Sequence, residues 1–263
     1  MLAFCLATST QGAPILYGAT GSGSGTGTLV TINLLTGAAT TVGPLNDSLG
    51  QNYRITGLAF DPMSGVLYGS SNNQSPTNPG SLVTIDPSTA IVTFVGSFGI
   101  PAQTMADLTF APNGTLYGWL EGNDDSLFTI NKGTGQATLV GWSGISTYGS
   151  GLAANAQGVI YLAGQGVAGD FHVIDATTGV ATYVATLIGS GLNGSNAIGA
   201  MAFSPSGTLY AAATALASCF PVPYGRSGSI RRRHPHCLPG ARVTSPCLRL
   251  KEFCRPTQGS GLK

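Results

Sequence analysis

The sequence predicts an all-β protein, a β-propeller of four-stranded antiparallel blades, and three observations lead to this prediction. One pattern recurs along the chain: an apolar run ending in Leu-x-Phe, a Pro-x-Gly turn, Leu-Tyr-Gly, a run ending in Ile-Asn or Ile-Asp, a Thr-Gly turn and Thr-x-Val-Gly. Apolar residues and Thr alternate in short runs between Gly, Pro, Asn and Asp, which is typical of strands and not of helices. The pattern tyrosines recur at close to the period of about 40–50 residues that marks propeller blades; they are Tyr17, Tyr68, Tyr117, Tyr161 and Tyr210.

The copies are expected to differ in completeness. The first begins at residue 15 with its second strand, so its first strand is expected to be missing, and residues 1–14 are interpreted as a leader or the remnant of a signal peptide. The next three copies are complete, and the fifth has only its first two strands. Residues 15–215 therefore predict three complete repeats and two partial ones, either as an open arc prone to aggregation or as a four-blade ring with one strand left over.

The polar residues of the pattern are interpreted as turn formers. Asn33, Asp86, Asn131 and Asp175 occupy the same place in four copies, and a turn of this kind needs only a side-chain oxygen that accepts hydrogen bonds from nearby backbone amides. We therefore expect structural roles for them. Small residues in the first strand, such as Gly57, suit the crowded strand nearest the propeller axis.

These units resemble bacterial secreted β-propeller repeats of the YVTN and WD-like kind, which implies an extracellular or cell-surface location. The Leu-Tyr-Gly, Ile-Asp-x-x-Thr-Gly and Thr-x-Val-Gly elements carry this resemblance over about residues 15–215. A weaker similarity is to quinoprotein propellers, in which a Trp follows the Thr-Gly turn. Because Trp119 and Trp142 lie outside that place, we expect no quinone and no other organic cofactor.

The segment 216–263 shares nothing with the repeats. It holds seven Arg and two Lys against Glu252, and four of the five cysteines. We interpret it as disordered or as the product of a reading-frame change. Zinc binding by His234, His236 and the cysteines lacks paired Cys-x-x-Cys spacing. Arg231–Arg233 lack the interleaved aromatics of a nucleic-acid module, so no nucleic acid is expected as a partner.

The repeats offer little chemistry. His172 stands where other copies place Val or Phe and is interpreted as a strand residue, and the Gly-rich run 21–27 leads into a strand, so a phosphate-binding loop is not expected. The one acidic cluster, between the second and third strands of the third copy, predicts a calcium site, because hard oxygen ligands suit that ion. Its candidate ligands are Glu121, Asn123, Asp124 and Asp125.

Three hypotheses for function follow. The leading one is a secreted or surface-exposed binding or scaffold module for a protein or glycan, because residues 1–215 contain only His172, Arg54 and Lys132 as nitrogen-bearing ionisable side chains. The alternative is a lyase or hydrolase with its site at the mouth of the propeller channel. The third is a truncated product without function. No run approaches the roughly 18 apolar residues that a membrane span requires, so none is expected.

Overall fold

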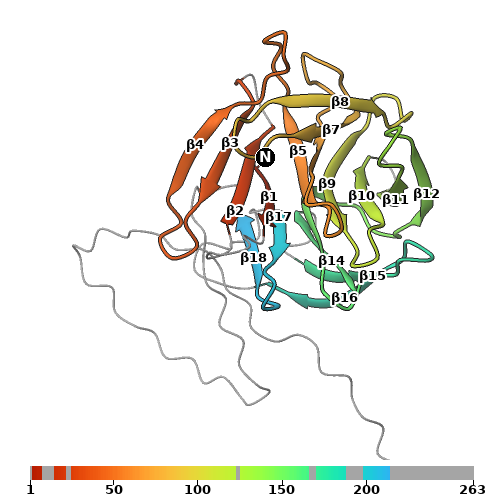
Figure 1. The fold of residues 1–263 in the computed structure, drawn as a ribbon. Helices are drawn as coiled ribbons and strands as arrows, with labels where there is room; N and C mark the ends of the chain where they lie inside the picture. Colours follow the sequence, from red (N-terminus) through yellow and green to blue (C-terminus); the bar gives the residue numbers. More distant parts are fainter. Residues whose placement is uncertain are drawn as a thin grey trace, which may run out of the picture.

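The computed structural model describes residues 2–7, 15–21, 25–122, 125–165, 170–187 and 198–213. This part of the chain is all-β, as predicted, and forms a β-propeller (Figure 1). Four blades are four-stranded antiparallel sheets in simple meander order, and a fifth sheet has two described strands. The first strand of each sheet lies near the centre of the ring, and the fourth strand of each four-stranded blade lies at its rim (Figure 1).

The strands follow the repeats. The first sheet contains β1 (Leu2–Ala7), β2 (Ile15–Thr20), β3 (Thr28–Ile32) and β4 (Ala39–Pro44). The second contains β5 (Ile55–Phe60), β6 (Leu67–Ser71), β7 (Ser81–Ile85) and β8 (Val92–Ser97). The third contains β9 (Thr104–Phe110), β10 (Leu116–Glu121), β11 (Ser126–Ile130) and β12 (Ala137–Trp142). The fourth contains β13 (Tyr148–Ala154), β14 (Ile160–Gln165), β15 (Asp170–Ile174) and β16 (Ala181–Thr186), and the fifth contains β17 (Ile198–Phe203) and β18 (Leu209–Ala213).

The first blade is complete, and the expectation that it lacks its first strand is wrong. Strand β1 pairs antiparallel with β2, from Leu2 opposite Thr20 to Ala7 opposite Ile15. The count is therefore four complete sheets and a two-stranded fifth, and not three complete repeats. Sequence reasoning missed β1 because its sequence, LAFCLA, reads as a continuous apolar run, which also describes a leader. That residues 1–14 act as a leader stays a prediction.

The inner strands close into a ring, so the prediction of an open arc is also wrong for the described residues. Strands β1, β5, β9, β13 and β17 each contact the next, and β17 contacts β1. Buried apolar side chains seal this last junction, with Leu16 and Ile32 of the first sheet packed against Ala200 and Tyr210 of the fifth. The N-terminal strand thus supplies the contact that an arc would leave exposed.

Aromatic pairs between blades explain two elements of the repeat. The Tyr of one blade packs against the Phe that ends the first strand of the next blade, with ring centroids 5.6 Å apart in each pair. Such tilted or edge-on pairs add about 0.5–1.5 kcal/mol beyond the area they bury. The pairs are Tyr17 with Phe60, Tyr68 with Phe110, and Tyr161 with Phe203.

A close backbone approach at the rim explains the glycine of Thr-x-Val-Gly. A Cβ at Gly96 would lie 1.9 Å from the carbonyl oxygen of Thr134, in the turn between the last two strands of the next blade. Gly141 stands in the same relation to Thr178, also at 1.9 Å. Only glycine allows the rim strand to approach the neighbouring turn so closely.

The turn residues act as predicted. Asp86 Oδ1 accepts hydrogen bonds from the amides of Ser88 and Thr89, at 2.8 and 3.2 Å. Asn33, Asn131 and Asp175 accept the equivalent pairs of amide hydrogen bonds at 2.7–3.2 Å. The hydroxyl and amide of Ser88 lower the pKa of Asp86. The carboxylates at this place are therefore turn formers.

Two further expectations concern the segment 216–263 and membrane spans. The segment 216–263, with its reading-frame hypothesis, its Cys and His residues and its arginines, lies outside the described residues. Within the described ranges the chain forms no helix of the length and apolarity that crossing a bilayer would need.

Candidate functional site

The two ends of the propeller carry different connections. Loops between second and third strands, and loops between blades, lie on one end, which we call the loop face. The hairpin turns from first to second and from third to fourth strand lie on the other, the turn face. On the loop face two adjoining hollows of about 320 and 450 Å³ share Asn73, Pro101, Ala102 and Gln103. We call the combined hollow the loop-face groove.

An aromatic ring, side-chain amides and one carboxylic acid line the groove. Asn73 comes from the β6–β7 loop and Gln103 from the β8–β9 loop, and Glu121 ends β10 at the far wall. Tyr148, at the start of β13, lines the same end and is 67% exposed. Three blades therefore contribute polar side chains around one exposed aromatic ring, the usual composition of an orientation-specific binding site.

Backbone strain is present in the groove wall. Ala102 has a φ of 59°, in the left-handed region that residues with a Cβ rarely adopt. The side-chain amide of Asn73 donates a 3.3 Å hydrogen bond to the Ala102 carbonyl, which ties the two loops together. Strain of this kind costs on the order of 1–3 kcal/mol and gathers at functional sites.

Of the predicted calcium set, Glu121 lines the groove and Asp125 is buried, and both accept hydrogen bonds from the start of the fourth blade. Glu121 Oε1 accepts from the amide of Ser150 at 2.7 Å. The buried carboxylate of Asp125 accepts from the amide and the hydroxyl of Thr147, and from the amide of Gly122 at 3.1 Å. Burial raises the pKa of Glu121, and the Ser150 amide opposes that rise.

The other two members, Asn123 and Asp124, lie outside the described residues. Among the described residues, no three His, Cys, Asp or Glu side chains gather as a metal site would require. The calcium site therefore stays a prediction, and the structure adds that Glu121 and Asp125 also hold the third and fourth blades together.

A buried hydrogen-bond network fixes the backbone next to Tyr148. Thr147 Oγ1 accepts hydrogen bonds from the indole nitrogen of Trp119 at 3.2 Å and from the hydroxyl of Ser150 at 2.6 Å, and it donates to Asp125. Trp119 is fully buried. Because each partner is fixed by the others, the backbone that carries Tyr148 is preorganised.

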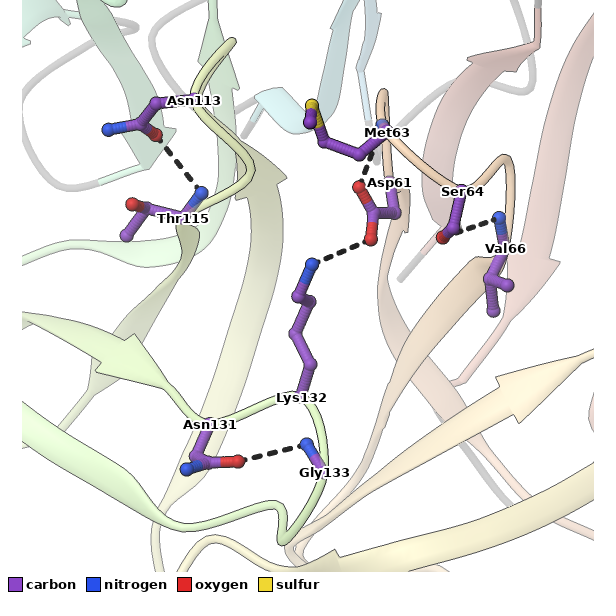
Figure 2. Close-up of polar contacts among 9 residues, drawn as sticks. All are labelled: Asp61, Met63, Ser64, Val66, Asn113, Thr115, Asn131, Lys132 and Gly133. Atoms are coloured by element: carbon purple, nitrogen blue, oxygen red, sulfur yellow. Dashed lines mark hydrogen bonds and ion pairs between the residues drawn. The ribbon is translucent and has the colours of Figure 1, made fainter.

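The turn face carries an ion pair between blades (Figure 2). Lys132, in the turn after β11, extends to Asp61, which follows β5, with Nζ 2.7 Å from Oδ2. The ammonium also lies 5.5 Å from the ring centroid of Phe110. Burial alone would raise the pKa of Asp61, but Lys132 and the Met63 amide hold it below its ordinary value. The pair joins the second blade to the third.

Sequence reasoning missed Asp107, which lies in the inner strand β9 with no exposed surface. Its carboxylate accepts hydrogen bonds from the amides of Leu108 at 2.9 Å and of Leu152, in β13, at 2.8 Å. Burial raises its pKa well above the ordinary value, while amides that include those of Leu58 and Met201 oppose the rise. The sequence offered one signal for this site, because Asp107 is an ionisable residue within a largely apolar strand.

His172 is a buried strand residue in β15, as interpreted. Its ring packs edge-on to Tyr183, with centroids 5.9 Å apart. Burial lowers its pKa, and its Nδ1 has no hydrogen-bond partner among the described residues. It lines neither the groove nor the axial pocket described below.

Comparisons with solved structures agree with the fold. A Bacteroides thetaiotaomicron protein of unknown function is 17% identical with a TM-score of 0.54, over 79% of this chain and 55% of that chain. This chain thus spans just over half the length of that protein. A chain of a nidogen/laminin complex is 14% identical with a TM-score of 0.51, over 81% of this chain and 71% of that one.

No curated protein matches the chain. A family model does match, over residues 14–197, and its description is a repeat of unknown function, DUF6923. The match covers the first four blades except β1, together with the link to the fifth sheet. The chain therefore belongs to the DUF6923 family of repeat proteins.

Proposed function

We propose that this propeller is a secreted or surface-exposed bacterial module that binds a glycan in its loop-face groove. The observation that carries the proposal is the exposed ring of Tyr148, at one end of a groove whose other polar side chains are mainly neutral. A rigid aromatic ring offers contact area at low entropic cost, and amides can both donate and accept hydrogen bonds.

The groove chemistry favours a polyhydroxylated ligand over an anionic one. Asn73 and Gln103 present amides, Thr104 and Thr147 come from adjoining strands and loops, and no cationic residue lines either hollow. Hydroxyl groups of a sugar can pair with both atoms of an amide, while the apolar face of a sugar ring can lie on Tyr148. An anionic ligand would find no positive partner among the lining residues.

The fixed base of the groove also supports binding. Preorganised loops lose less conformational entropy when a ligand binds, so a shallow site gains affinity. Here Thr147 and Ser150 hold the base of Tyr148 through Asp125 and Glu121, and Asn73 ties the two loops of the opposite wall.

A glycan panel tests the proposal. The wild-type chain is expected to bind at least one neutral oligosaccharide, and Tyr148→Ala should weaken that binding at least tenfold. Tyr183→Ala is the matched control, because Tyr183 is 55% exposed on the outer strand β16, away from the groove. No binding by a folded wild type, or equal losses in both variants, would overturn the proposal, as would binding of a protein ligand alone.

A further inference from the structure

A second hollow, the axial pocket, opens on the turn face where the inner strands end. Its volume is about 330 Å³, and residues from all five sheets line it. Cys5, Leu58 and Met201 lie among its lining, together with the rings of Phe60, Phe110 and Phe203, and every lining residue is uncharged. The pocket is separate from the loop-face groove and shares no residue with it.

The pocket departs at the fourth blade from a phenylalanine that the second, third and fifth blades share, and the first blade has Leu6 at this place, opposite Leu16. Phe60, Phe110 and Phe203 each end an inner strand opposite Leu67, Leu116 and Leu209, respectively. In the fourth blade the equivalent residue, opposite Ile160, is Ala154. Two residues later the second, third and fifth blades have Pro62, Pro112 and Pro205, whereas the fourth has Ala156, and both alanines line the pocket. A missing phenyl group thus leaves room on one side of an aromatic wall.

The remaining rings are held in position. Each packs against a tyrosine of the preceding blade, at 5.6 Å between centroids and at interplanar angles of 54–63°. A wall whose rings are fixed by a second layer is preorganised for a ligand. Phenylalanine rings favour another aromatic ring in an offset or edge-on arrangement.

The polar groups at the pocket are already engaged. Thr109 Oγ1 accepts a hydrogen bond from the Ala154 amide at 2.9 Å, and Ser204 Oγ accepts one from the Thr208 amide at 2.9 Å. Lys132, which lies over Phe110, is paired with Asp61. An ionic ligand would therefore lose its hydration without gaining a free counter-charge.

From this geometry we propose that the axial pocket binds a neutral aromatic molecule of one or two fused rings, in the space that Ala154 leaves open. The volume lies at the lower end of the range for small-molecule sites. The ligand would stack on the phenylalanine wall with one ring edge toward Ala154. This proposal does not depend on glycan binding in the loop-face groove.

Calorimetry with 2-naphthol tests the proposal on the full chain. One molecule is expected to bind per chain, and Ala154→Phe should weaken binding more than tenfold because it introduces the ring found in the second, third and fifth blades and narrows the pocket. Ala154→Leu should give a smaller loss, which keeps the test valid if the phenylalanine variant fails to fold. Ala39→Phe, at an exposed site on β4, is the matched control and should bind as wild type does.

Two further ligands test the stated chemistry. The anion 2-naphthoate and the saturated alcohol cyclohexanol should each bind at least tenfold more weakly than 2-naphthol. Equal binding of 2-naphthoate would contradict the neutral site, and equal binding of cyclohexanol would contradict the aromatic one. Absence of 2-naphthol binding, or unchanged binding by folded Ala154→Leu and Ala154→Phe, would overturn the proposal.

Discussion

Asp107 in β9 accepts a 2.8 Å hydrogen bond from the backbone amide of Leu152 in β13, so a carboxylate links two neighbouring inner strands at the centre of the propeller. The same place in the second and fourth blades is Gly57 and Gly151, and in the fifth it is Ala200. One carboxylate thus lies among residues with little or no side chain, where the strands are closest.

Removal of this link should destabilise the ring. Asp107→Ala leaves the amides of Leu108 and Leu152 without their acceptor, and an unsatisfied buried amide costs about 1–3 kcal/mol. We expect a loss of that order in the free energy of unfolding at pH 5, measured by urea titration. Asp107→Asn retains one acceptor oxygen and should lose less. Equal stability of wild type and Asp107→Ala would contradict a linking role.

The raised pKa of Asp107 predicts a pH dependence with a definite sign. Because the folded-state pKa lies above the unfolded value of about 3.9, the folded chain retains the proton over the interval between the two. The contribution of Asp107 to the free energy of unfolding is complete below the unfolded pKa and is lost as pH rises toward the folded pKa. The stability of wild type relative to Asp107→Asn should therefore fall from pH 4 upward. A flat or rising difference in parallel urea titrations would refute this.

The ion pair of Asp61 and Lys132 predicts the opposite pH dependence. The pKa of Asp61 is lowered, so its contribution is present above the unfolded value of about 3.9 and is lost as pH falls through the folded value. Lys132→Met should cost about 1–2 kcal/mol at pH 7, a modest value because Lys132 is partly exposed and solvent screens the pair. A double-mutant cycle with Asp61→Asn measures the coupling, and a coupling that persists unchanged at pH 2 would contradict the account.

The rim glycines predict a contrast between two substitutions of the same kind. Gly141→Ala would place a Cβ 1.9 Å from the Thr178 carbonyl oxygen, so two backbones must separate, at a cost of about 1–3 kcal/mol. At Gly43 the nearest atom to an added Cβ is the Thr89 carbonyl oxygen, 3.3 Å away, a tight contact that a small backbone shift relieves, so Gly43→Ala should cost clearly less than Gly141→Ala. Thermal melts of the two variants check the contrast, and similar shifts in Tm would argue against it.

Calcium binding at Glu121, Asn123, Asp124 and Asp125 can be tested by its effect on melting. A ligand that binds only the folded state raises stability by about 2.7 kcal/mol at a hundred times its Kd. We expect millimolar calcium chloride to raise the Tm relative to EDTA, and Asp124→Asn to remove the rise. Equal Tm values in the two buffers would end the calcium hypothesis.

The sequence predicted the blades well because their pattern repeats. Alternating strands, the turn oxygens of Asp86 and Asp175, and the small residue Gly57 at the axis are local features with a physical reason at each copy. Strand β1 was missed because its sequence, LAFCLA, is apolar throughout and resembles a leader, and with it ring closure was missed.

The candidate site was harder to predict because binding residues do not follow the repeat. Asn73, Gln103 and Tyr148 come from loops and strand ends of three blades, and only closure of the ring brings them together. Their places in the other copies hold unrelated residues, so periodicity gives no signal. Glu121 and Asp125 were identified as an acidic cluster, but their hydrogen bonds to the fourth blade depend on tertiary packing.

Chemical-shift mapping tests the central claim, that the loop-face groove is the glycan site, most directly. An isotope-labelled chain is titrated with the tightest oligosaccharide from the panel, and backbone amide signals are followed. We predict that the largest shifts fall on residues that line the groove, above all Gln103, Gly122 and Tyr148. Shifts confined to the outer strands β4, β12 and β16, or to residues of the axial pocket, would contradict the claim.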